Sequence, residues 1–146
     1  MAKPQQAIER EIVAELGERA AGGLKQHAPT RLFALLNKPG SDWDKAFEHI
    51  SDHFRRTPDK PAHTVYAERY RDKEALRKLL LDAASVPSEV RLTKLKIHGD
   101  NMGKPAIEIR RWFNKQVGDN QTLTWLRIFV DFQGNLITAY PDDGTK

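Results

Sequence analysis

The 146-residue sequence contains no cysteine. Disulfide frameworks, thiolate zinc sites and cysteine nucleophiles are therefore excluded, and the fold must depend on its hydrophobic core. Long hydrophobic runs are also missing, since none approaches the roughly 18 residues that a membrane span needs. Residues 1–21 are amphipathic and rich in acidic side chains, unlike the apolar centre of a secretion signal. We therefore expect a soluble domain without a membrane partner.

The sequence also lacks the short motifs of common enzymes. It has no glycine-rich phosphate loop, no dinucleotide fingerprint, no His-Glu-x-x-His and no calcium loop. Among its five histidines, only His49 and His53 are spaced to share a helix face, and no third ligand is obvious. The favoured interpretation of this pair is a surface feature of a helix, and neither a metal nor a cofactor is predicted.

Charge is unevenly distributed along an otherwise ordinary globular composition. Hydrophobic residues make up 39% of the chain and charged residues 30%. Residues 1–50 carry 7 Lys/Arg and 7 Asp/Glu, residues 51–116 carry 15 and 9, and residues 117–146 carry 2 and 4. The excess of +6 in the middle segment favours a polyanionic partner such as RNA. A solvated basic face is the alternative interpretation.

The first third of the sequence is predicted to be helical. A helix begins near Pro4 and ends at Gly22-Gly23, a short helix covers residues 28–36, and a third begins at Ser41 as its N-cap and runs to Phe54. The polar, proline-containing connector that follows suggests a boundary. We therefore divide the chain into a helical segment, 1–57, and a catalytic domain, 58–146.

Strands are expected mainly in the second half. Asp72 is predicted to cap a fourth helix, after which apolar residues alternate over 90–97. Residues 106–113 fit either a strand or a helix. Residues 122–132 and 136–140 are predicted to form a hairpin around the turn 133–135. Helices followed by a small antiparallel sheet indicate the α+β class.

One cluster of possible site residues follows the boundary. His63 is a candidate general base because imidazole titrates near neutrality. Arg69 and Arg71 offer planar donor groups for a phosphate, and Tyr66 and Tyr70 can stack on bases. The alternative is a loop histidine with two core tyrosines.

A second cluster lies in the last expected strand. Alternation places Thr138 and Tyr140 on one face, opposite Ile137 and Ala139. Two hydroxyls on one face can donate to phosphoryl oxygens, although threonine and tyrosine are also good strand formers.

The sequence Leu-Arg-Ile-Phe-Val-Asp-Phe-Gln-Gly-Asn-Leu-Ile-Thr-Ala-Tyr-Pro at 126–141 resembles a hairpin found in bacterial toxins. It is similar to the closing hairpin of C-terminal ribonuclease domains in polymorphic and contact-dependent inhibition toxins. The groups concerned are the barnase–EndoU–colicin–RelE-like and bacterial ribonuclease-A-like ones. The resemblance extends over about 63–141. It implies a site made of His63, Arg69 or Arg71, Thr138 and Tyr140.

Such a site would cleave RNA without a metal, by attack of the RNA's own 2′-hydroxyl. The EndoU pattern has a second histidine and a lysine, which His98 and either Lys94 or Lys96 would supply. The general acid is Tyr140 or His98.

The leading hypothesis is therefore a bacterial toxin endoribonuclease, possibly specific for tRNA. It would be monomeric, delivered from a producer cell into the cytoplasm of a target cell, and bound by an acidic immunity protein over the basic region. The alternative is a non-catalytic basic module that binds RNA or protein. A weaker third hypothesis, an ADP-ribosyltransferase using Arg69 and Glu108, lacks the expected acidic loop.

Overall fold

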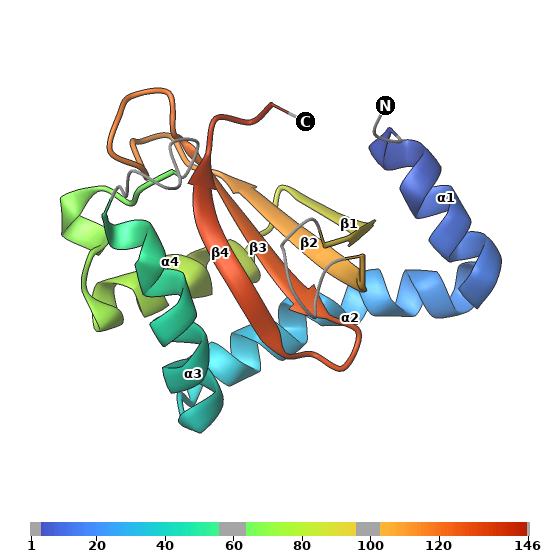
Figure 1. Cartoon of the computed structure of the whole chain (residues 1–146). Helices are drawn as coiled ribbons and strands as arrows, with labels where there is room; N and C mark the ends of the chain where they lie inside the picture. The colour runs from blue at the N-terminus through green and yellow to red at the C-terminus, as the bar shows by residue number, and fades with distance from the viewer. Residues whose placement is uncertain (1–3, 56–63, 96–102, 146) are drawn as a thin grey trace.

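The computed structural model describes residues 4–55, 64–95 and 103–145 (Figure 1). Helices dominate the first part of the chain and a four-stranded antiparallel sheet the second, so the α+β prediction is confirmed. The α-helices are α1 (Gln5–Leu16), α2 (Glu18–Asn37), α3 (Ser41–Ile50) and α4 (Lys73–Ser85), with short 3-10 turns η1 (Ser51–Phe54) and η2 (Glu68–Tyr70).

The helix boundaries differ from the prediction at two glycine positions. Gly22 and Gly23 lie inside α2, and the break between α1 and α2 falls at Gly17, whose φ of +92° favours glycine. The predicted end at Gly22 is wrong because α2 packs Ala21 and Leu32 into the core on both sides of the glycine pair. Packing of this kind overrides the low helix propensity of glycine.

Two predicted helix caps have opposite outcomes. Ser41 is the first residue of α3 rather than its cap; Gly40 occupies the cap position, and no side chain caps this end. Asp72 does cap α4, because its carboxylate accepts a hydrogen bond of 2.9 Å from the backbone N–H of Ala75.

The sheet is a meander in the order β1-β2-β3-β4. Its strands are β1 (Glu89–Lys94), β2 (Pro105–Trp112), β3 (Trp125–Asp131) and β4 (Leu136–Asp142). Residues 106–113, which fit either type of element, therefore form mainly a strand. The predicted hairpin is present, and its turn contains Gly134 at a φ of +92°.

One face of the sheet, called the inner face here, packs on α2 and α4, which lie behind the sheet in Figure 1. Leu92, Ile109 and Ile128 from the sheet share one hydrophobic core with Leu32 of α2 and Leu80 of α4. Residues from both sides of the expected boundary at 57/58 thus belong to the same core.

The opposite face, called the outer face, carries the alternate residues of each strand. Ala139 is fully buried in the core, and Thr138 and Tyr140 lie together on the outer face, as predicted. Ile137 does not lie opposite them. The register shifts beside Val130, and Ile137 packs with Phe129 in a small cluster on the outer side.

Helix α1 covers the free edge of the sheet. Leu92 of the edge strand β1 accepts a 2.5 Å hydrogen bond at its carbonyl oxygen from Gln5, and its N–H donates 2.8 Å to a Glu9 carboxylate oxygen. The two side chains replace the backbone partners that a fifth strand would provide. This places α1 beside the outer face at its β1 side (Figure 1).

Candidate functional site

The outer face carries charged side chains in two adjacent rows across the sheet. One row contains Arg91, Glu108, Phe129 and Thr138, each paired with its neighbour on the next strand. The second row contains Glu89, Arg110, Arg127 and Tyr140 in the same relation. Since strand pairing brings such side chains close together, the meander itself assembles this group from four strands.

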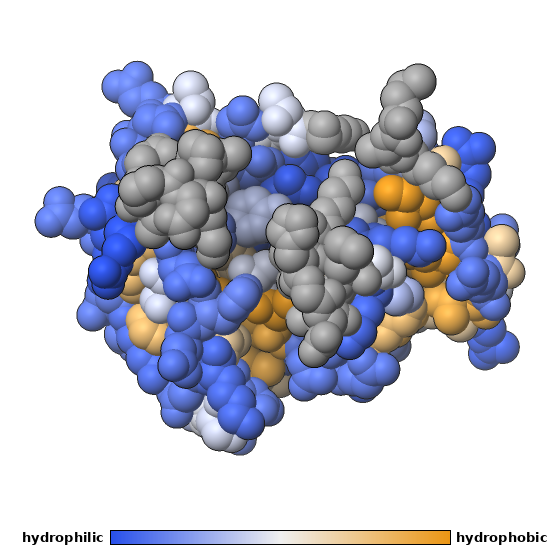
Figure 2. Space-filling view, in the orientation of Figure 1, coloured by the Kyte–Doolittle hydropathy of each residue, from blue (hydrophilic) through white to orange (hydrophobic). Residues whose placement is uncertain are grey.

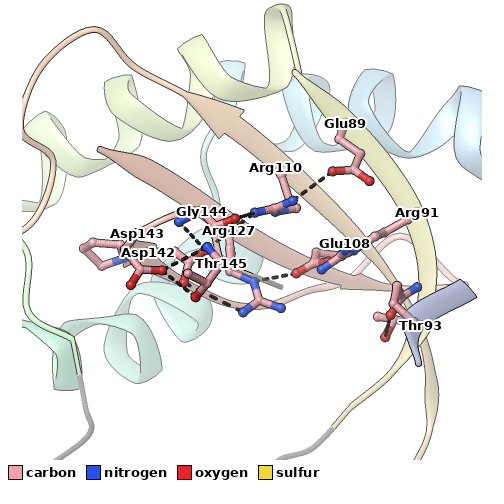
Figure 3. Close-up of polar contacts among 12 residues, drawn as sticks. Glu89, Arg91, Thr93, Glu108, Arg110, Arg127, Asp142, Asp143, Gly144 and Thr145 are labelled. Atoms are coloured by element: carbon pink, nitrogen blue, oxygen red, sulfur yellow. Dashed lines mark hydrogen bonds and ion pairs between the residues drawn. The ribbon is translucent and has the colours of Figure 1, made fainter. Parts of the chain in front are cut away.

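Glu108 lies at the centre of this group and is fully buried. Its Oε1 accepts a hydrogen bond from Nε of Arg91 on β1, and its Oε2 accepts one of 2.5 Å from Nε of Arg127 on β3 (Figure 3). A buried carboxylate of this kind requires paired charges to offset its lost hydration. Both arginines bond through Nε, so the carboxylate fixes the plane in which each guanidinium lies.

Arg110 makes different contacts, although it lies directly opposite Arg127. Its Nη1 donates 2.9 Å to Glu89 and its Nη2 donates 3.0 Å to the carbonyl oxygen of Gly144, and its guanidinium lies 4.7 Å above the Trp125 ring. Its Nε is buried without a partner among the described residues. Arg110 therefore attaches the C-terminal residues to the sheet and is not exposed to solvent.

A cavity of about 1210 Å³ lies between the outer face and α1. Figure 2 shows a hydrophobic area beside α1 on this face, among largely hydrophilic residues. Charged and hydroxyl groups from three strands reach the cavity, together with residues of α1. The lining side chains used below are Arg10, Arg91, Lys94, Arg127, Thr138 and Tyr140.

The two hydroxyls on β4 are available to a bound molecule. Thr138 and Tyr140 both line the cavity, and neither hydroxyl forms a hydrogen bond with any described residue. Thr138 is nevertheless only 4% exposed, so a ligand that takes its hydrogen bond would be largely removed from water. The site therefore combines guanidinium and hydroxyl donors, which is what a phosphoryl group requires.

The Tyr140 ring is held between neighbours. His53 stacks on it at 5.2 Å, Phe129 at 6.0 Å, and the Arg127 guanidinium lies 5.7 Å from its centre. Burial raises the pKa of the Tyr140 phenol above 10.0; Arg127 opposes this rise, and Glu108 adds to it. Tyr140 therefore keeps its proton at neutral pH and acts as a hydrogen-bond donor.

His53 is a residue that the sequence did not assign to the site. The surface-pair interpretation is wrong for it: His49 is exposed on α3, whereas His53 lies in η1, half-buried against Tyr140. Its Nδ1 lies 2.7 Å from the carbonyl oxygen of Thr64. That contact makes Nδ1 the protonated nitrogen and Nε2 the acceptor of the neutral ring.

The structure brings together only part of the residues that the sequence proposed. Thr138, Tyr140 and Lys94 line the cavity. Arg69 bonds to the carbonyl oxygen of Gln116 and lines a separate, shallow hollow. Arg71 bonds through Nε to the carbonyl oxygen of Tyr66.

The two tyrosines lie in the hydrophobic core. Tyr66 is fully buried and donates 2.8 Å to the carbonyl oxygen of Ala139, and Tyr70 is 9% exposed. The Tyr66 ring packs between Phe54 of η1 and Ala139 of β4. It is therefore not accessible for stacking on an RNA base. His63, Lys96 and His98 lie outside the described residues.

Neither a metal-binding cluster nor a membrane-spanning helix is found in the described ranges. No group of three or more His, Asp or Glu side chains there is placed to hold a metal ion. No helix among those residues is both long and apolar enough to cross a membrane.

Comparison with known proteins gives no match. Neither the family models, the curated proteins nor the solved structures include one similar to this chain.

Proposed function

We propose that the protein is an endoribonuclease that cleaves RNA by attack of the 2′-hydroxyl on the adjacent phosphorus, without a metal ion. The observation that carries this proposal is that Arg91 and Arg127 line one cavity with Thr138 and Tyr140. Both arginines are bonded to the buried carboxylate of Glu108 directly behind them. These side chains offer a base, two cations and two hydrogen-bond donors in one place.

Arg91 and Arg127 would hold the non-bridging oxygens of the phosphate to be cleaved. Glu108 uses only the Nε atom of each, which leaves the Nη atoms to other partners. Nη1 of Arg127 is 3.9 Å from Asp142, and the Nη atoms of Arg91 have no partner among the described residues. Guanidinium groups aimed at the phosphorus stabilise the charge that develops on its oxygens in the transition state.

Glu108 would act as the general base. Each carboxylate oxygen accepts one hydrogen bond, from the Nε atom of one arginine, and keeps a second lone pair that can accept a proton. Glu108 is fully buried and does not itself line the cavity, so this role requires the 2′-hydroxyl to reach the carboxylate between the two arginines. His63, to which the sequence assigned this role, lies outside the described residues, and its role stays a prediction.

Tyr140 would supply the proton on the opposite side. Its raised pKa keeps the phenol protonated, and its hydroxyl reaches the cavity from β4, across β3 from Glu108. In the reaction, Glu108 takes the proton of the 2′-hydroxyl, the 2′-oxygen bonds to phosphorus, and the bond from phosphorus to the 5′-oxygen breaks. The leaving oxygen receives the proton of Tyr140. The products are a 2′,3′-cyclic phosphate and a 5′-hydroxyl.

The experiment is incubation of the purified protein with total RNA in EDTA, followed by identification of the chemical ends. We expect fragments with 2′,3′-cyclic phosphates, and no cleavage of the same sequence as 2′-O-methyl RNA, in which the nucleophile is blocked. Cleavage that stops in EDTA and returns with a divalent ion would contradict the proposal. Intact RNA that is nevertheless bound would favour the non-catalytic RNA-binding module.

The acidic immunity protein expected from the sequence stays a prediction. The cavity suggests where this partner would bind, because its carboxylates would contact the same guanidinium groups as the phosphate. Competition between this partner and RNA for the cavity is therefore expected.

A further inference from the structure

The cavity continues along α1, beyond the arginines and hydroxyls proposed to bind the phosphate that is cleaved. Gln6, Arg10 and Val13 of α1 line it, at the helical spacing that places side chains on one face. On the other side it is lined by Thr93 and Lys94 at the end of β1. The cavity therefore reaches from the β4 hydroxyls across the sheet to the first helix.

Most charges along this lining are already paired. Glu9 accepts a 3.0 Å hydrogen bond from Lys25 and also receives the Leu92 N–H, and Glu89 pairs with Arg110. Arg91 and Arg127 share Glu108.

Two cations of the lining have no such partner among the residues that the structure describes. Arg10 and Lys94 form no ion pair within the described part of the chain. They face the same cavity from different elements, α1 and β1. Because no described carboxylate pairs with either cation, this end of the cavity attracts an anion.

We propose that Arg10 and Lys94 form a second phosphate subsite, which binds a phosphate next to the one that is cleaved. The substrate is then an RNA strand with at least two consecutive phosphates rather than a dinucleotide. This inference rests on the proposed function for the identity of the strand, and it assigns the first helix to substrate binding.

The position of α1 supports this role. Gln5 is held at two points, since its Nε2 donates to the Leu92 carbonyl oxygen and its Oε1 accepts 3.0 Å from the Thr93 hydroxyl. Glu9 holds the next turn of the helix against the same strand. Arg10 therefore extends from a fixed wall, which lowers the entropic cost of binding a phosphate between Arg10 and Lys94.

The test measures binding of a 2′-O-methyl RNA hexanucleotide, which binds without being cut, over a range of salt concentrations. Each phosphate contact to a single strand contributes about 0.7 to the slope of log K against log salt. The double variant Arg10→Gln/Lys94→Gln is expected to lower the slope by about 0.7. Lys78→Gln, an exposed charge change on α4 behind the sheet, serves as the matched control and should leave the slope unchanged.

The outcomes separate this subsite from the proposed reaction. An unchanged slope in the double variant overturns the subsite, even if the protein cleaves RNA, and so does a wild-type protein that fails to bind the hexanucleotide at low salt. Binding with the expected change of slope, but without cleavage of unmodified RNA, supports the subsite and overturns the proposed function. A second readout follows from length: the wild-type protein should bind a trinucleotide with two phosphates at least tenfold more tightly than a dinucleotide.

Discussion

Arg110 and Arg127 lie directly opposite each other on β2 and β3, two like charges in one cross-strand pair. Their repulsion is offset by two carboxylates: Arg110 pairs with Glu89, which lies directly opposite it on β1, and Arg127 pairs with Glu108, its diagonal neighbour on β2. Asp142 lies 3.7 Å from the first guanidinium and 3.9 Å from the second. The two arginines have different roles. Arg110 is buried under the C-terminal residues, whereas Arg127 lines the cavity.

Because of these different roles, substitution of Arg110 should mainly lower stability, and substitution of Arg127 should mainly lower the cleavage rate. Arg110→Ala removes one partner of a buried charge network and should lower the free energy of unfolding by about 3 kcal/mol. Arg127→Lys keeps the charge but loses the planar donor group, so cleavage should fall more than tenfold with a much smaller loss of stability. Urea denaturation and initial cleavage rates measure the two effects. Equal losses of stability in both variants would contradict these separate roles of Arg110 and Arg127.

The role of the two β4 hydroxyls can be tested by substitutions that preserve the shape of each side chain. Thr138→Val and Tyr140→Phe each remove a hydroxyl from the cavity with little change in volume. If these groups donate to the phosphate and the leaving oxygen, each variant should cleave RNA more than tenfold more slowly, with a melting temperature near that of the parent. Cleavage at the parent rate in both would show that the two residues are only good strand formers.

The pH dependence of stability should be controlled at the alkaline end by Tyr66. Burial raises the pKa of its phenol well above 10.0. A raised pKa in the folded state means that this contribution to stability is complete below pH 10 and is lost as pH rises toward the folded value. We expect the free energy of unfolding to fall above pH 10.

Tyr66→Phe is the variant that identifies the group responsible. It should be about 1 kcal/mol less stable at pH 7, because the hydrogen bond to Ala139 is lost. It should also show a weaker decline above pH 10. An unchanged alkaline decline in this variant would assign the effect to other groups.

The break between α1 and α2 gives a matched pair of glycine substitutions. Gly22→Ala lies within α2 with open space around its Cβ position, so it should raise stability by about 0.4–1 kcal/mol. Gly17→Ala must adopt a φ of +92° and should lower stability by about 1–2 kcal/mol. Thermal melts of both variants check this, and stabilisation by Gly17→Ala would contradict the observed helix break.

The sequence predicted those features that depend on local patterns. Alternation predicted the β3–β4 hairpin and the shared face of Thr138 and Tyr140, and the Asp72 cap followed from residue type and position. It did not predict Glu108 as part of this site, because no short motif joins residues on β1, β2 and β3.

A weaker signal for the site was present in the strands. Glu89 and Arg91, and likewise Glu108 and Arg110, are spaced by two, so charged residues recur on the face opposite the core. Only the strand register, which sequence alone does not specify, shows that Glu108 meets Arg91 and Arg127. The position of His53 likewise depends on long-range packing against β4.

We propose that the group formed by Arg91, Glu108 and Arg127 cleaves RNA through the 2′-hydroxyl. The most direct measurement uses a DNA oligonucleotide with a single ribonucleotide, incubated in EDTA with the parent protein and with Glu108→Gln. Circular dichroism and thermal melting show whether the variant is folded, and Glu108→Asp, which keeps the charge, serves as a second variant if it is not. We expect the parent to cut only after the ribonucleotide, leaving a 2′,3′-cyclic phosphate, and folded Glu108→Gln to be about 10²–10⁴-fold slower. Cleavage of the all-DNA strand, or an undiminished rate in folded Glu108→Gln, would contradict this mechanism.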